Sequence, residues 1–171
     1  KLNAMRKIFS FVAVTIAALS LSLASCMKDP AKAVSVDMSE GKTANISGTL
    51  LVNPNLSASP QTYKGMETKI MVSVPYSEIF NNPQAKGSWS TMITSNSNGE
   101  FSVTVPASVS GVNVSFTASD VRGEQRQNSS TTFKGVWKFN IGSENVKSGK
   151  TVVKEATIGT FTKLAENGSE I

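Results

Sequence analysis

Residues 97–106 read Ser-Asn-Gly-Glu-Phe-Ser-Val-Thr-Val-Pro, and this stretch decides the fold class. The Asn-Gly pair tolerates the left-handed backbone of a tight hairpin turn. Behind the pair, Phe101, Val103 and Val105 alternate with polar residues, which is the period of a strand with one buried face. The final proline ends the pattern because it cannot donate a hydrogen bond to a sheet. The stretch therefore predicts antiparallel β structure.

The same alternation recurs along the chain on both sides of this stretch. We expect strands at Ala44–Val52, Ile70–Val74, Trp89–Ile93, Phe101–Val105, Val112–Ala118, Phe133–Ile141 and Val152–Ile158. In the last of these runs, Val152, Ala156 and Ile158 are expected to share one face. Short strands whose solvent positions hold Ser, Thr and Asn indicate an all-β fold, a seven-stranded antiparallel Greek-key β-sandwich.

The segments between the runs have the composition of turns and loops. Asn98-Gly99 is expected to form a tight hairpin between the third and fourth strands. Longer loops are expected at 54–65, 77–87 and 120–130, which are rich in Asn, Ser, Gln and Pro. One short helical turn is expected around Tyr76–Phe80.

The order of these motifs resembles a known family. Its elements here are Ile46-Ser47-Gly48-Thr49, Ile70-Met71-Val72-Ser73-Val74, the stretch 97–106, and Val114-Ser115-Phe116-Thr117. Together they resemble carboxypeptidase-regulatory-like domains, which are transthyretin-like (prealbumin-like) β-sandwiches, over roughly Ala44–Thr160. In that family the domain is an accessory module without catalytic residues, so the resemblance implies a fold and a non-catalytic role.

The N-terminus has the features of a secretory signal peptide. A cationic start at Met5-Arg6-Lys7 precedes the uncharged apolar stretch 8–23, which is shorter than the ~20 residues of a membrane-spanning helix. Leu23-Ala24-Ser25-Cys26 resembles the lipobox of bacterial lipoproteins. That resemblance implies cleavage between Ser25 and Cys26 and lipid attachment, palmitate included, at Cys26. An ordinary secreted protein with a stray Cys, or an N-terminal anchor helix, is the alternative.

These features divide the chain into four expected parts. They are a signal peptide at 1–25 that starts at Met5, a lipidated tether at 26–42, a sandwich at 43–162 and a flexible tail at 163–171. Met27-Lys28-Asp29-Pro30 resembles the surface-export signal of Bacteroidetes lipoproteins. The expected location is the outer membrane, lipid-anchored through Cys26, on the cell surface or the periplasmic face.

Composition argues against several classes of function. The 171 residues include one Cys and no His, which removes the commonest general base and the commonest zinc ligand. Three of the 17 Lys and Arg residues precede the expected cleavage site, so the remaining 14 nearly balance the 12 acidic ones. They form no basic run, and we expect no nucleic-acid partner. We also expect no cofactor, no metal and no enzymatic activity.

A few side chains are candidates for ligand contact. Tyr63 and Tyr76 lie in loop-like segments, and Trp89 could present an aromatic face to a sugar, although core packing or a rim position explains them as well. Trp137 is in phase with apolar neighbours and is expected in the core.

Two pairs of acids are close in the sequence. They are Asp37 with Glu40 and Asp120 with Glu124, and neither lies in a calcium-loop motif. Arg122 and Arg126 are potential partners of the second pair.

The sequence thus favours a lipid-anchored envelope protein that acts as a non-catalytic binding or adhesion module with a protein or glycan partner. Two alternatives stay open. One is a periplasm-facing scaffold or accessory subunit of an outer-membrane complex, and the other, less favoured, is a carbohydrate-processing accessory.

Overall fold

The structure is a computed structural model that describes residues 34–165 and 168–170. The expected signal peptide, the Ser25–Cys26 cleavage site and the lipid-bearing Cys26 lie outside the described residues. The β-rich unit of the chain begins at Val36. Its elements are β1 (Thr43–Val52), β2 (Lys64–Gly65), β3 (Lys69–Pro75), α2 (Tyr76–Ile79), β4 (Ser88–Thr94), β5 (Glu100–Pro106), β6 (Val112–Ala118), β7 (Val121–Arg126), β8 (Thr132–Lys138), β9 (Ser143–Val146), β10 (Thr151–Val153), β11 (Thr157–Ile158) and β12 (Thr160–Lys163).

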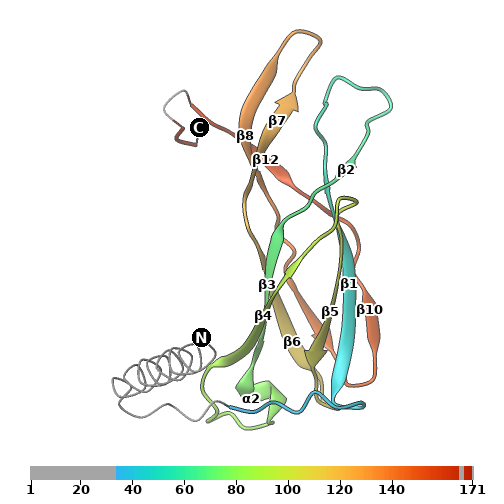
Figure 1. Ribbon diagram of the computed structural model, residues 1–171, viewed down its shortest axis with the longest axis vertical. Helices are drawn as coiled ribbons and strands as arrows, with labels where there is room; N and C mark the ends of the chain where they lie inside the picture. The colour runs from blue at the N-terminus through green and yellow to red at the C-terminus, as the bar shows by residue number, and fades with distance from the viewer. Residues whose placement is uncertain (1–33, 166–167, 171) are drawn as a thin grey trace, which may run out of the picture. The chain divides into compact units, whose positions relative to one another are not determined.

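The fold is all-β, as expected, and β1 lies at the centre of its first sheet (Figure 1). One edge of β1 pairs antiparallel with β5 and then with β2. The other edge pairs parallel with β10 and then β11. The expectation of a purely antiparallel arrangement is therefore wrong for this sheet. The alternation of apolar residues is the same in both kinds of pairing, so the pattern could not distinguish them.

A second sheet has the strand order β4-β3-β6-β9 and is antiparallel throughout. One apolar cluster takes side chains from both sheets, which makes the arrangement an open sandwich. The cluster follows the predicted alternation, since every second residue of β1, β3, β5 and β6 is buried. Its fully buried members include Ile46, Leu50, Ile70, Val72, Val74, Val105, Val112 and Val114.

A third sheet, β12-β8-β7, extends beyond the sandwich at the end where β1 stops (Figure 1). The strands β6–β7 and β8–β9 form one long hairpin. The pairs Val112↔Val146 and Arg126↔Thr132 are in the same register, so no residue is inserted between them. The loop expected at 120–130 is therefore wrong for its first half, which is β7. The residues of β7 alternate as in a strand, but most of them are polar or charged, so the segment has the composition of a loop.

Two of the expected strands differ from the observed ones. The first, Phe133–Ile141, ends as a strand at Lys138 and belongs to the third sheet, and the sandwich receives β9 in its place.

The second, Val152–Ile158, is split into β10 and β11. Between them, the offset from β1 grows by one residue, from Ser47↔Val153 to Leu50↔Thr157. An extra residue exchanges the two faces of a strand. Val152 accordingly packs against the core, whereas Ala156 and Ile158 are exposed.

The Asn98-Gly99 turn is tight, as predicted, but it connects two sheets and no ladder joins β4 to β5. The Gly99 N–H donates to the Asn96 carbonyl (2.8 Å), and Gly99 has φ +80°. A Cβ on Gly99 would lie 2.0 Å from the Leu50 carbonyl oxygen. A Cβ on Gly65 would lie 2.0 Å from the carbonyl carbon of Asn98. Both glycines are thus required where this turn packs on β1. The short helical turn expected around Tyr76–Phe80 is confirmed as α2.

We expect Gly99→Ala to destabilise the domain more than Gly149→Ala, because only Gly99 is in close contact with backbone. Gly149 has φ +73° and nothing within 4 Å of its missing Cβ. Its substitution should cost about 1–2 kcal/mol, the left-handed penalty alone. Gly99→Ala should cost roughly 3 kcal/mol or more, since backbone must move. Urea unfolding of both variants measures the difference, and equal losses would contradict the close packing of the turn.

Candidate binding surface at the far end of the strands

The three aromatic residues predicted to contact a ligand do not form one site. Tyr63 precedes β2, at the end of β1, and its side chain is 48% exposed. Tyr76 is in α2 at the opposite end of the sandwich, where its ring stacks on Phe80 at 5.8 Å. Trp89 is half-buried and packs against the core cluster. We call the end of the domain where β1 stops at Val52 the far end. Of the three residues, Tyr63 is the one whose position suits contact with a partner there.

Trp137, expected in the core, is 2% exposed but lies outside the main cluster. Its ring packs on Phe161 with centroids 4.8 Å apart. A Cβ on Gly123 would lie 2.9 Å from the Trp137 Nε1 atom, so the glycine leaves room for the indole. This small second core holds the third sheet together.

The loop between β1 and β2 is tied to β7 by side-chain amides. The Gln125 Nε2 group donates to the Asn53 carbonyl (3.0 Å), and the Asn53 Nδ2 group donates to Gln61 Oε1 (2.6 Å). Gln125 Oε1 in turn accepts from Gln127 Nε2 (2.6 Å). Gln125 and Asn53 are buried, at 7% and 6% exposure. Buried amides are stable only when their hydrogen bonds are satisfied, so this network fixes the loop against the hairpin.

Beside this network, the third sheet has a shallow hollow of about 440 Å³. Its lining is Gln125, Gln127, Phe133, Phe161, Thr162 and Lys163. The Lys163 Nζ atom lies 3.9 Å from the centre of the Phe133 ring, within the range of a cation–π contact. The hollow thus combines amide donors and acceptors, a hydroxyl, an ammonium group and partly buried aromatic rings. Such groups suit recognition of a polar ligand with some apolar surface.

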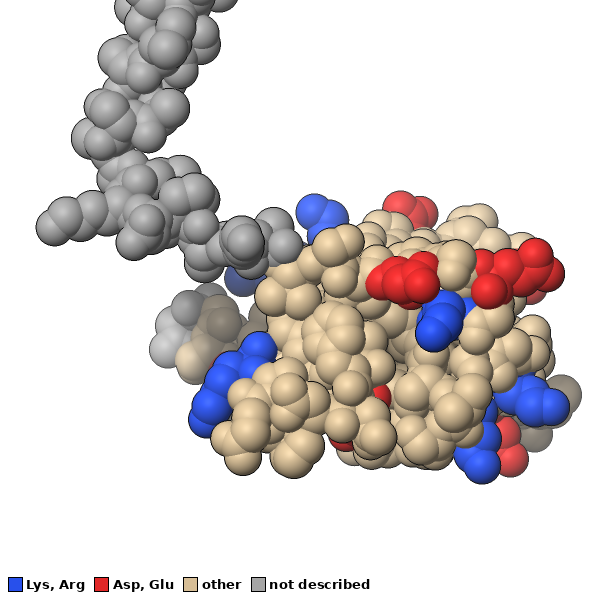
Figure 2. Space-filling model, turned by 90° about the horizontal axis from the view of Figure 1, so that it is seen from below, with Lys and Arg blue, Asp and Glu red and all other residues tan. Residues whose placement is uncertain are grey.

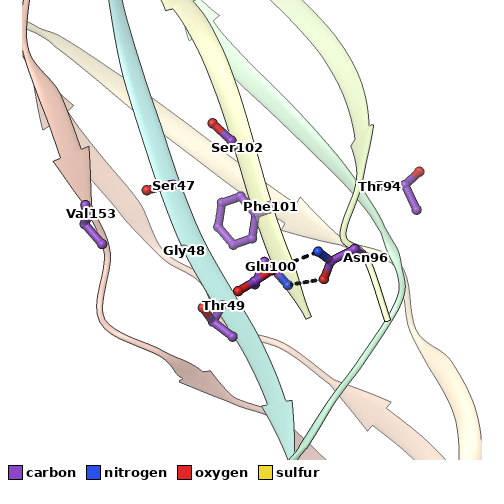
Figure 3. A pocket seen from close by; sticks show the side chains of 9 residues that line it. All are labelled: Ser47, Gly48, Thr49, Thr94, Asn96, Glu100, Phe101, Ser102 and Val153. Atoms are coloured by element: carbon purple, nitrogen blue, oxygen red, sulfur yellow. Dashed lines mark hydrogen bonds between the residues drawn. The ribbon is translucent and has the colours of Figure 1, made fainter. Parts of the chain in front are cut away.

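A second hollow, of about 450 Å³, lies along β1 and β5 near the end of β4 (Figure 3). Its lining is Ser47, Gly48, Thr49, Thr94, Asn96, Glu100, Phe101, Ser102 and Val153. The Asn96 Nδ2 group donates to Glu100 Oε2 (2.9 Å), so the carboxylate in the hollow already has a partner. Gly48 is necessary here because a Cβ would lie 2.7 Å from the Phe101 ring. The hollow thus presents hydroxyl groups and a carboxylate that is already hydrogen-bonded.

The acid pairs are not part of a potential metal-binding group in the described residues. Among residues 34–165 and 168–170, no group of three potential metal ligands comes together. Arg126, expected to neutralise Asp120 or Glu124, instead donates from its guanidinium to the carbonyls of Asn128 (3.0 Å) and Ser129 (2.6 Å). The arrangement can bind a partner through hydrogen bonds and aromatic faces.

Two exposed groups have perturbed pKa values. Hydrogen bonds from the hydroxyl and the backbone N–H of Ser39 hold the pKa of Asp37 below its usual range. The hydrogen bond to Glu170 raises the pKa of Lys138. The first contact shapes the segment before β1, and the second holds Glu170 against β8. Neither group lines one of the two hollows.

The charges are otherwise dispersed. Figure 2 shows the α2 end of the domain, where Lys and Arg are interspersed with Asp and Glu among mostly uncharged residues. Within the described part of the chain, no helix combines the length and the hydrophobicity needed to cross a membrane. No protein-family model matches this chain, and no curated protein matches its sequence.

Sequence reasoning missed the amide network and the hollow beside it. Gln125, Gln127 and Lys163 fall in segments that were expected to be loop or tail, and Phe133 was counted as core. One signal was available. In Val121–Arg126 the charged residues occupy every second position, which is the period of a strand with one exposed face.

We expect Gln125→Ala to loosen the β1–β2 loop, because the Asn53 carbonyl would lose its buried partner. The free energy of unfolding should fall by about 1–3 kcal/mol. Amide exchange should accelerate most at Leu56 and Arg126, whose N–H groups join the loop to β7. Exchange at Ser119, which bonds to Lys69 in the sandwich, is the internal control. Uniform acceleration at all three would contradict a local role.

Proposed function

We propose that this chain is a lipid-anchored protein of the bacterial outer membrane, and that its domain is a non-catalytic binding or adhesion module. The observation that supports this most is the direction in which β1 runs through the domain. The expected tether precedes Thr43, where β1 begins, and the hairpin of β7 and β8 lies beyond the end of β1 at Val52 (Figure 1). Tyr63 precedes Lys64, which pairs with Val52, and the amide network joins Asn53 to Gln125, so both lie at the Val52 end. Ten strand residues separate these ends by about 30 Å. An anchor at Cys26 would therefore leave the far end free for a protein or glycan partner.

We also propose that the domain belongs to the transthyretin-like sandwiches. The support is the topology of its two sheets. One sheet has three strand positions, β5, β1 and the interrupted strand β10/β11, and the other has four. On this count β2, β7, β8 and β12 are additions to a seven-stranded sandwich. The accessory role of that family is consistent with shallow hollows lined by amides, hydroxyls and aromatic rings.

Protease digestion of intact cells tests the location. We expect the wild-type domain to be cleaved while a periplasmic marker is spared, because the anchor and the export signal would place it outside. Protection until lysis would instead support the periplasm-facing scaffold. Cys26→Ala should leave the membrane fraction, since two or more acyl chains are needed for stable anchoring. A Cys26→Ala protein that fractionates like the wild type would refute the lipid anchor.

Binding at the far end is tested with a glycan array and the full-length protein in detergent. We expect Phe133→Ala to weaken binding about tenfold, equivalent to ~1.4 kcal/mol, because it removes the aromatic face of the hollow. Phe80→Ala, a 43% exposed ring at the opposite end, is the matched control. Equal losses in both variants, or binding that neither affects, would argue against the hollow. If no glycan binds, the glycan-partner reading is wrong.

A further inference from the structure

The free edge of β4 differs from the other sheet edges in the described residues. We propose that β4 pairs antiparallel with β4 of a second copy, about a two-fold axis at Thr91. This would join two four-stranded sheets into one. The proposal concerns self-association and does not depend on the lipid anchor.

The hydrogen bonds between β3 and β4 show which backbone groups of β4 are free to bond to another strand. The ladder between β3 and β4 is continued at its ends by Tyr76 N–H to the Gly87 carbonyl and by Ser95 N–H to the Thr68 carbonyl, both 3.0 Å. Alternate residues of an antiparallel strand bond to the same neighbour. The odd-numbered residues of β4 therefore bond to β3. The backbone groups of the even-numbered ones point away from the sheet: Ser88, Ser90, Met92 and Thr94.

This edge lacks the usual protection. Its sequence, Ser-Trp-Ser-Thr-Met-Ile-Thr, contains no charge, no proline and no glycine over seven residues. Natural edge strands avoid association by charges, prolines, bulges or short length. Met92 is 52% exposed there, and its register partner Met71 on β3 is 47% exposed. β4 thus offers an extended, neutral and partly apolar edge.

The other edges in the described chain are protected by proline, charge, a covering loop or short length. On β5, Pro106 has no N–H, and the Glu100 N–H already donates to Asn96 Oδ1 (2.9 Å). β7 is charged and is covered by the β1–β2 loop, through bonds from Arg126 N–H to Pro54 and from Leu56 N–H to Arg126, both 2.8 Å.

The remaining edges are short. β9, β10 and β12 have four, three and four residues, and β2 and β11 have two each. Charged residues lie in or next to β9, β10 and β12, including Glu144, Lys150 and Lys163.

This contrast identifies the occupant as a second copy. Among the described edges, β4 is the long one without a charge, a proline or a covering loop, so its matching edge is β4 of a second copy. Two neutral strands meet without charge repulsion. An axis at Thr91 places Ser90 opposite Met92 of the other copy and Ser88 opposite Thr94, so all outward backbone groups find partners. The assembly stops at a dimer, because the pairing uses the β4 edge of both copies.

Cysteine cross-linking of the full-length protein in intact cells tests the register. In Ser90→Cys/Met92→Cys, each new thiol faces its counterpart at the ~5.5 Å Cα separation that a disulfide spans. Mild oxidation should give a covalent dimer. Ser115→Cys/Thr117→Cys has the same spacing and exposure on β6, which is paired on both sides, and should give none. The wild type controls for Cys26. Equal yields from the two variants, or a cross-link to a different protein, would overturn the proposal.

A charge test distinguishes the edge from the face beside it. Met92→Lys should weaken self-association of the detergent-solubilised protein by about tenfold or more, because lysine blocks edge pairing. Met71→Lys, its exposed neighbour on an inner strand, should leave association unchanged. Circular dichroism and urea unfolding establish that both variants are folded. A monomeric wild type, or equal effects of the two lysines, would overturn the proposal.

Discussion

The structure depends on β1 being paired along both edges. Along one edge it holds β5 and β2, and along the other it holds the C-terminal strands β10 and β11. Its even-numbered residues are buried between the sheets, from Ala44 to Val52. In this sheet β1 therefore joins strands from the middle of the chain to strands from its end, and a residue that disturbs β1 affects contacts of long sequence separation. This is why the approach of Gly99 to the Leu50 carbonyl needs a residue without a side chain.

The far end of the domain also depends on the pairing of β1 with the C-terminal strands. One residue is inserted between β10 and β11, and it shifts the C-terminal strand relative to β1. Beyond Gly159, whose N–H still donates to the Leu51 carbonyl (2.8 Å), the chain leaves β1 and pairs with β8. The third sheet is thereby linked to the sandwich through continuous strands. A partner bound at the hairpin would act on elements continuous with the core.

Much of the sandwich could be predicted because burial imposes a period of two. The runs around Ile46, Val72, Val103 and Val114 are strands with buried faces as expected. The alternation does not show whether two strands run parallel or antiparallel, which strands pair, or where a residue is inserted. These depend on contacts between distant segments, so the parallel pairing of β1, the division of the last run and the role of β9 were not foreseen. β7 was missed because the residues that alternate along it are charged and polar, whereas the strand prediction rests on alternating apolar residues.

The candidate binding surface was difficult to predict for a related reason. A glutamine in a polar segment is ordinarily a loop residue, and Gln125 becomes informative only when its strand neighbours bury it against Asn53. Burying amides there has a cost that apolar side chains would not incur, since each unsatisfied group is unfavourable by about 1–3 kcal/mol. The main core between the sheets is built from apolar side chains. Polar burial at the far end is therefore not demanded by the sandwich, which argues that it serves to position the loop and hairpin relative to each other.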